Sequence, residues 1–168
     1  LHVSGRLKVA PEHTQDEVLK QMRKPSFSQF GQFKKIFDKV NRQYGLNQQL
    51  IPYFISSHPG CTEADMAELA GITKSLHFQL EQVQDFTPTP MTLATEMYYT
   101  GYHPYTLEKV YTARSKEQKL AQRQFFFWYK PESRRQIMQV LQKMGRKDLI
   151  EKLFGQRGDM NPAPRKRR

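Results

Sequence analysis

The sequence predicts an α/β protein in which three strand–turn–helix units build a parallel sheet. Three apolar, strand-like runs occur at residues 7–9, 50–56 and 78–83. Each run ends in polar residues and a turn, and a helical pattern follows each turn. The runs lie about forty residues apart or closer, a spacing typical of βα units in parallel sheets. Polar side chains where such strands end commonly form ligand sites.

In the first unit, Thr14 and Glu17 have the spacing of a capping box, which predicts that a helix begins at Thr14. Ser26 or Ser28 begins the next helix, and Gly45 is its predicted C-terminal cap. Apolar side chains along this second helix recur at three- and four-residue steps: Phe30, Phe33, Phe37, Val40 and Tyr44.

In the second unit, Thr62 and Asp65 predict a capped helix start, and Gly71 is the predicted end of that helix. In the third unit, Pro90 suits a first helical turn and predicts a short helix over residues 91–98.

Beyond these units the composition changes. A tyrosine-rich loop precedes a helix capped by Ser115 that runs into the aromatic residues 125–129. Pro131 begins another helix, and residues 147–154 form a last short one. We therefore expect three segments: the βα units over residues 1–98, a loop and helical extension over 99–154, and a disordered basic tail over 155–168.

Charge and composition limit the choice of partners. The chain has 168 residues, a net charge of +11 and only 38% hydrophobic residues. The low apolar content indicates either a partly solvated chain or a core completed by residues elsewhere. The basic excess suits anionic partners such as RNA, DNA or phosphates, although basic proteins are also simply soluble.

Cys61 is the only cysteine, which excludes an intrachain disulfide and a cysteine cluster that binds metal. This fits a reducing compartment, and we expect a cytoplasmic protein. No signal peptide and no apolar run of about eighteen residues is present, so no membrane span is predicted. Cys61 adjoins a helix start, where a reactive thiolate is favoured, but lone cysteines are also often inert.

Five longer phrases resemble the YgiQ-type group of radical SAM enzymes. In chain order they are GRLKVAPEH (residues 5–13), PYFISSHPGC (52–61), QVQDFTPTPMT (82–92), MYYTG (97–101) and LAQRQFFFWYKP (120–131). The resemblance covers nearly the whole chain except the tail. It implies the second half of a partial (β/α)6 barrel, followed by the group's helical extension.

The resemblance also implies a cofactor and an activity. In that family a 4Fe–4S cluster binds S-adenosylmethionine and cleaves it reductively, and the radical formed abstracts hydrogen from a substrate. The cluster-binding CxxxCxxC motif is absent from this chain. We therefore expect the parent protein to be an enzyme with an unidentified substrate, and this chain to be inactive without the missing N-terminal half of the barrel.

By position, the strand ends would line the S-adenosylmethionine side of that barrel. Glu12 would accept hydrogen bonds from the ribose hydroxyls or would simply complement a helix dipole. His13 would bond a ligand or help to cap the helix. Ser56, Ser57 and His58 would face the methionine or adenine part.

The third turn supplies Asp85, Thr87 and Thr89 as further candidates on the same side. His58 is either a general base or a structural hydrogen-bonding group. The aromatic residues 125–129 either stack nucleobases or belong to the core.

Two other hypotheses for the function of the whole chain stay open. One is a non-catalytic basic module that binds RNA or another polyanion, for which the aromatic residues and the basic tail would supply the contacts. The other is a truncated remnant without function, which would expose apolar surface.

Overall fold

The computed structural model describes residues 5–155 and confirms the predicted α/β class. Its parallel sheet has the strand order β1-β2-β3. The strands are β1 (Arg6–Glu12), β2 (Gln49–Ser56) and β3 (Gln82–Asp85). Apart from Gly155, the tail predicted over residues 155–168 lies outside the described residues.

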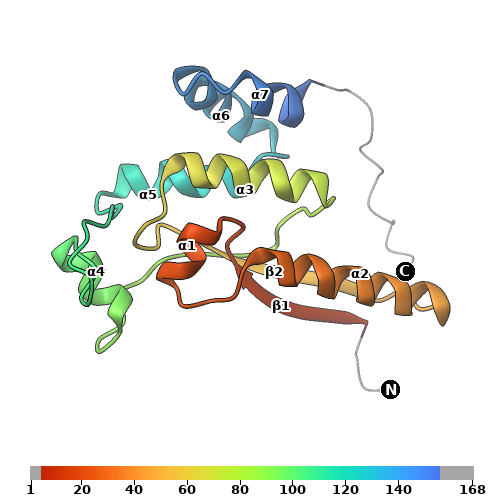
Figure 1. The fold of residues 1–168 in the computed structure, drawn as a ribbon. Coiled ribbons are helices and arrows are strands. Elements are labelled where there is room, and N and C mark those ends of the chain that lie inside the picture. Colours follow the sequence, from red (N-terminus) through yellow and green to blue (C-terminus); the bar gives the residue numbers. More distant parts are fainter. Residues whose placement is uncertain (1–4, 156–168) are drawn as a thin grey trace.

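The helices follow the strands in the predicted alternation (Figure 1). They are α1 (Asp16–Gln21), α2 (Phe27–Gln43), α3 (Glu63–Ser75), α4 (Leu93–Thr100), α5 (Lys116–Arg123), α6 (Pro131–Lys143) and α7 (Lys147–Phe154), with a 3₁₀ turn, η1 (Gln124–Phe127), between α5 and α6. The starts predicted at Ser115 and Pro131 and the last helix over 147–154 are confirmed.

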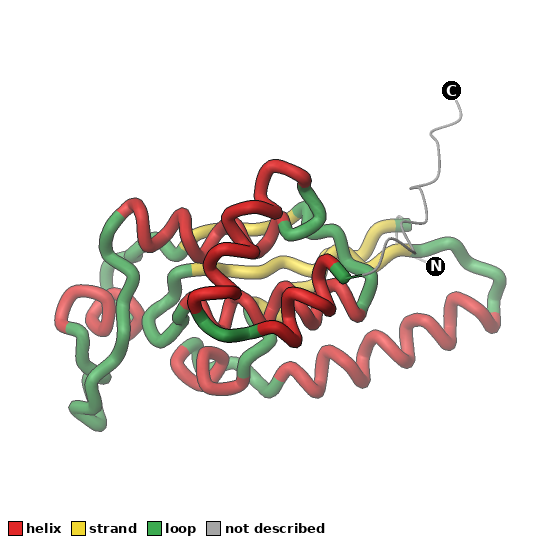
Figure 2. The backbone as a smooth tube through the Cα atoms, turned by 90° about the horizontal axis from the view of Figure 1, so that it is seen from above, coloured by secondary structure: helices red, strands yellow, loops and turns green. Residues whose placement is uncertain are grey.

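Helices cover one face of the sheet. Phe54 on β2 is fully buried, and Val83 on β3 packs against the same core. Helices α3, α5, α6 and α7 lie above the strands in Figure 1, and Figure 2 shows helices across this face from above. The core cluster contains Met66 and Leu69 of α3 and, from the extension, Phe125, Phe126, Ile137, Leu141, Leu149 and Leu153.

The opposite face of the sheet is more polar. Strand residues alternate between faces, so Arg6 and Lys8 of β1 and Tyr53 of β2 lie opposite the buried Phe54. Arg6 and Lys8 are exposed, and Arg6 forms an ion pair of 2.6 Å with Glu81 just before β3. Within residues 5–155 no helix covers this face in Figure 1.

Helix α1 begins differently from the prediction. Its N-cap is Gln15, without a side-chain cap, and the capping box predicted from Thr14 and Glu17 is wrong. Glu12 has a φ of 66° and the His13 N–H bonds to the Pro11 carbonyl, so the chain turns sharply here. That turn places the His13 ring, and not the Thr14 hydroxyl, against the first free backbone N–H of the helix.

Helix α2 has the predicted caps, because the Ser26 hydroxyl accepts the Ser28 N–H and Gly45 follows the helix with a φ of 60°. Of its apolar side chains only Phe30 is buried. Ile36 and Tyr44 are 63% and 66% exposed. Among the described residues, therefore, the outer apolar side of α2 has no covering element.

The predicted end of α3 is also wrong. The capping box of Thr62 and Asp65 is present, but the helix continues through Gly71 to Ser75. A Cβ atom at position 71 would lie 2.9 Å from Leu149 Cδ2 of α7. The glycine therefore allows α3 and α7 to approach each other closely and does not end the helix.

The third unit is shorter than predicted. Phe78 and Leu80 precede β3, whose four residues begin only at Gln82. Helix α4 begins after Thr92, whose hydroxyl accepts the Thr95 N–H, so Pro90 is not in a first helical turn. A threonine cap and the preceding turn take the place of the predicted proline start.

We expect Gly71→Ala to lower the free energy of unfolding by about 1 kcal/mol, because overpacking against Leu149 outweighs the gain in helix propensity. The matched control is Gly31→Ala in α2, where a Cβ atom would meet nothing within 4 Å. That variant should be more stable by roughly 0.5–1 kcal/mol. Urea unfolding of both variants measures the difference, and equal stabilisation by both would contradict the close packing of α3 and α7.

Candidate functional site

The carboxyl ends of the three parallel strands lie at one edge of the sheet. Glu12 of β1 is the register partner of Phe54, and Ser56 of β2 is the partner of Asp85 of β3. The structure therefore brings the strand-end residues predicted as a site to a common edge. The side chains of these residues nevertheless have different contacts and therefore different roles.

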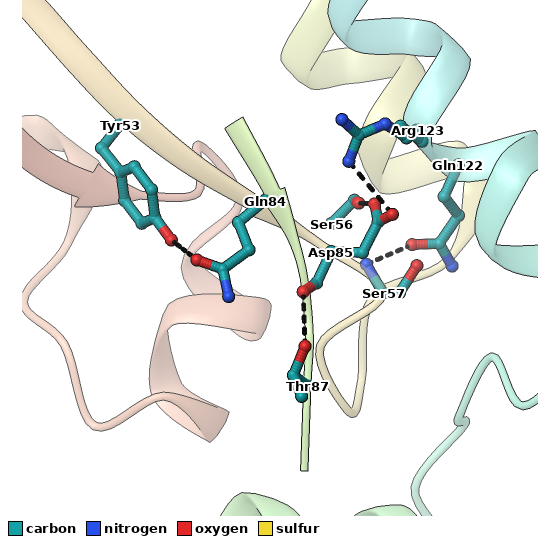
Figure 3. Close-up of polar contacts among 8 residues, drawn as sticks. All are labelled: Tyr53, Ser56, Ser57, Gln84, Asp85, Thr87, Gln122 and Arg123. Atoms are coloured by element: carbon teal, nitrogen blue, oxygen red, sulfur yellow. Dashed lines mark hydrogen bonds and ion pairs between the residues drawn. The ribbon is translucent and has the colours of Figure 1, made fainter. Parts of the chain in front are cut away.

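Ser56 and Asp85 are joined to the helical extension. The Ser56 hydroxyl donates a hydrogen bond of 2.6 Å to Asp85 Oδ1, and Arg123 Nη1 of α5 lies 3.1 Å from Asp85 Oδ2 (Figure 3). Both Asp85 oxygens thus have partners within the chain. These contacts attach α5 to the edge of the sheet, and the predicted role of Ser56 and Asp85 toward a ligand stays untested.

Gln122 makes a second attachment, between α5 and the turn after β2. Its role was not predicted from the sequence. Its fully buried side chain accepts the Ser57 N–H at 2.8 Å through Oε1 and donates to the Cys61 carbonyl at 2.7 Å through Nε2. The amide thereby closes the turn that follows β2. A polar residue just before the aromatic run was the only sequence signal, and it could not reveal partners more than sixty residues away.

His58 lies in this turn and is nearly buried. Its Nδ1 is 2.8 Å from the Pro59 carbonyl, which can only accept, so Nδ1 carries the proton and Nε2 is an acceptor. Burial lowers the pKa of His58, and the ring is therefore neutral at pH 7. His58 thus makes a structural hydrogen bond within its own turn, and its role as a base stays a prediction.

His13 and Cys61 form a buried pair beneath the edge. His13 Nδ1 accepts the Gln15 N–H at 3.0 Å, so Nε2 carries the proton and faces Cys61 Sγ at 3.5 Å. Burial, with a smaller effect of His58, lowers the pKa of His13 from 6.5 to about 3. Because its Nδ1 accepts the Gln15 N–H, His13 supports the start of α1, which is one of the two roles predicted for it.

Burial likewise raises the pKa of the Cys61 thiol, and the charge of Asp65 adds to the effect. The thiol is fully buried and protonated. The expectation that the adjacent helix start favours a thiolate is therefore wrong, because desolvation outweighs the helix dipole here.

Glu12 and Ser57 each carry a buried oxygen without a partner. Glu12 Oε1 lies 3.2 Å from Lys24 Nζ, but no group within residues 5–155 bonds to Glu12 Oε2 or to Ser57 Oγ. Both residues also have positive φ angles, 66° and 60°, which non-glycine residues rarely adopt. Buried polar atoms are normally hydrogen-bonded. Within residues 5–155, these two oxygens and His58 Nε2 are among the groups at this edge that could bond to a ligand.

The third turn, after β3, offers fewer groups that could bind a ligand. Thr87 is exposed, and its hydroxyl donates to the Asp85 carbonyl at 3.4 Å, while Thr89 donates to the Thr87 carbonyl at the same distance. Figure 3 shows Thr87 beyond the end of β3, with the Tyr53–Gln84 contact on the other side of the strand from Arg123. These threonines stiffen the turn, and their predicted role toward a ligand stays untested.

Between residues 5 and 155 no three His, Cys, Asp or Glu side chains are grouped so that they could hold a metal ion. In the same part of the chain no helix has the length and apolar character needed to cross a membrane.

The chain is similar over most of its length to proteins named UPF0313. It is 71% identical to one from Bacteroides thetaiotaomicron over 93% of this chain and 25% of that protein. The corresponding values are 69%, 91% and 24% for Porphyromonas gingivalis, and 46%, 89% and 25% for Methanocella arvoryzae. The chain thus spans about a quarter of the length of the curated relatives it matches, and their names state no activity.

Residues 81–158 match the family described as a domain of unknown function, DUF3362. This range includes β3 and the whole helical extension through α7. No solved structure matches the chain.

We expect Gln122→Leu to destabilise the chain by about 2–4 kcal/mol, because it leaves the Ser57 N–H and the Cys61 carbonyl buried without partners. Gln139→Leu, at an exposed position of α6, is the matched control and should change stability by less than about 0.5 kcal/mol. Chemical denaturation followed by circular dichroism measures both. A Gln122→Leu variant as stable as the control would show that this amide does not hold the two parts together.

The lowered pKa of His13 predicts a pH dependence of stability. The unfolded chain binds a proton at this imidazole below pH 6.5 and the folded chain does not until about pH 3. Stability is therefore fully present above pH 6.5 and is lost as the pH falls toward 3. His13→Asn keeps an acceptor for the Gln15 N–H but cannot titrate.

Between pH 6.5 and 4 the variant should lose about 2–3 kcal/mol less unfolding free energy than the wild type. Groups that titrate in both proteins and do not interact with His13 cancel in this comparison. Parallel curves of unfolding free energy against pH would show that His13 titrates normally in the folded chain.

Proposed function

We propose that the chain is the later part of a YgiQ-type radical SAM protein and contributes three βα units and a helical extension to a larger barrel. UPF0313 is the YgiQ-type family, and the similarity to its members extends over most of the chain. The parallel sheet with helices on one face is compatible with such a barrel, in which the helices form the outside. We place the protein in the cytoplasm, where its single cysteine would stay reduced.

The observation that carries this proposal is the pair of unpartnered oxygens at the carboxyl edge, Glu12 Oε2 and Ser57 Oγ. A carboxylate accepts hydrogen bonds from a diol, and S-adenosylmethionine carries a ribose diol. We therefore assign Glu12 to the ribose hydroxyls. Ser57 Oγ and His58 Nε2 would bond to other polar groups of the same ligand.

These residues would bind and orient the ligand. The ion pair of Lys24 with Glu12 Oε1 fixes the direction of the carboxyl group, so that Oε2 stays available. Gln122 holds the Ser57 backbone in place. When bound beside an iron–sulfur cluster, S-adenosylmethionine supplies radical chemistry by its reductive cleavage.

The residues of this chain do not fit the cluster itself. Cys61 is its single cysteine, and that thiol is buried, protonated and in contact with His13. A 4Fe–4S cluster needs several thiolates. We therefore place the cluster ligands in another part of the parent protein, and the chain alone would not carry out the reaction.

We further propose where that other part binds. Strand β1 pairs with β2 on one side, and no described strand pairs with its other edge. The exposed apolar side of α2 lies near this edge, and residues Val9, Phe27 and Phe33 line a common surface hollow between them. A preceding strand and helix of the parent protein would pair with β1 and cover α2.

We expect Glu12→Gln and Ser57→Ala, introduced into the full-length protein, to weaken the binding of S-adenosylmethionine about tenfold each. Each substitution removes one hydrogen bond to the ligand that involves a buried or charged group. The loss weakens the free energy of binding by about 1.5 kcal/mol. Equilibrium dialysis under anaerobic conditions measures the affinity. Glu17→Gln, an exposed residue of α1, is the control and should bind like the wild type.

Iron content measured on the same samples separates a lost ligand contact from a lost cluster. The proposal requires that iron per chain stays unchanged in all three variants. It is contradicted if the wild-type protein does not bind S-adenosylmethionine, or if Glu12→Gln and Glu17→Gln bind it equally well.

A further inference from the structure

A second surface with binding potential lies beside the carboxyl edge, on α4 and the loop that leads to α5. We call it the tyrosine surface and define it by Tyr99, Tyr102, Tyr105 and Tyr111, which are between 43% and 69% exposed. By contrast, Phe125 and Phe126 are fully buried. The expectation that the aromatic run 125–129 belongs to the core is thus confirmed for these residues. Stacking partners for bases must be sought in the tyrosines instead.

The backbone of this loop is held by many hydrogen bonds. Tyr102 and Lys109 form an antiparallel bridge, and the Val110 N–H bonds to the Gly101 carbonyl. The His103 ring accepts the backbone N–H groups of Tyr105 and Thr106. The backbone that carries the tyrosines is therefore held in one conformation, which lowers the entropy lost when a partner binds.

Basic side chains are interleaved with the rings. The Arg23 guanidinium lies 5.4 Å from the centre of the Tyr105 ring, and Lys119 Nζ lies 5.1 Å from that of Tyr98. Arg114 Nη2 donates to the Tyr99 carbonyl at 2.8 Å. Lys109, opposite Tyr102, is exposed.

Acidic residues are also present on this segment, namely Glu96, Glu108 and Glu117. The local positive charge is therefore moderate, although the chain as a whole carries +11. Alternating rings and cations match a partner with planar bases and a phosphate on every unit. Double-stranded nucleic acids do not offer their bases to such stacking.

A series of rings connects the tyrosine surface with the candidate site. His58 packs edge-on against Phe86 at 5.1 Å, Phe86 against Tyr98 at 5.7 Å, and Tyr98 against Tyr99 at 5.3 Å between ring centres. The Gly60 N–H also bonds to the Tyr111 carbonyl at 2.8 Å. The tyrosine surface is therefore in packing contact with the turn at the end of β2.

From these observations we infer that the tyrosine surface binds single-stranded nucleic acid, with bases stacked on the tyrosines and phosphates paired with Arg23, Lys109 and Lys119. This inference does not depend on the proposed radical chemistry, because this chain supplies all of the contacts.

The test is fluorescence anisotropy of the 168-residue chain with labelled twelve-nucleotide probes of uridine and of thymidine. Removal of two rings in Tyr99→Ala/Tyr105→Ala should weaken binding at least tenfold, whereas Tyr99→Phe/Tyr105→Phe keeps the stacking and should bind like the wild type. The matched control is Tyr44→Ala, because this tyrosine is equally exposed but lies at the end of α2. Circular dichroism spectra confirm that each variant is folded.

Salt and strandedness supply two further readouts. Pairing of three phosphates predicts that affinity falls roughly twentyfold between 50 and 200 mM salt. A duplex of the same length should bind at least tenfold more weakly than the single strand. A higher affinity for uridine or for thymidine would identify RNA or DNA as the preferred partner.

The inference is overturned if neither probe binds at 50 mM salt. It is also overturned if the double alanine variant binds like the wild type, since binding would then depend on charge elsewhere in the chain. Equal affinity for the duplex and the single strand would exclude base stacking and would likewise overturn the inference.

Discussion

The buried side-chain amide of Gln122 is the interaction on which the rest of this structure depends. Its two hydrogen bonds join α5 to the turn after β2, between residues more than sixty positions apart. The aromatic core residues Phe125 and Phe126 follow it directly in the chain, so its position also determines how the extension packs on the sheet. Arg123 and Asp85 add an ion pair beside it, but this pair is partly exposed and contributes less.

This attachment also shapes the candidate site. The Gln122 side chain accepts the Ser57 N–H, and the Asp85 carboxylate accepts the Ser56 hydroxyl. These two hydrogen bonds fix the end of β2 in a conformation with a positive φ angle at Ser57. Among the residues that the structure describes, the Ser57 hydroxyl then has no partner although it is buried, and the same holds for one oxygen of Glu12 on the neighbouring strand. Two strained residues with unsatisfied oxygens at adjacent strand ends favour a ligand site over an ordinary turn.

Features that depend on neighbouring residues could be predicted from the sequence. The three strands, the caps at Ser26, Thr62 and Ser115 and the last two helices follow from local hydrogen bonds and apolar periodicity. The errors at Thr14 and Pro90 have local causes, namely the turn at His13 and the cap at Thr92, whereas the errors at Gly71 and Cys61 arose where distant contacts decide. Gly71 continues a helix because α7 lies against it, and burial by several elements keeps Cys61 protonated. Likewise, no local pattern could show that Ser56 and Asp85 bond to each other or that Gln122 closes the site.

We propose that the carboxyl edge of this sheet binds S-adenosylmethionine in a longer protein. The most direct measurement is the release of 5′-deoxyadenosine by the full-length protein, incubated with S-adenosylmethionine and a strong reductant in the absence of oxygen. We expect a release of 5′-deoxyadenosine that requires bound iron and falls when Glu12 is replaced by Gln. An iron-loaded protein that releases no 5′-deoxyadenosine, or a full-length protein that binds no iron, would contradict it.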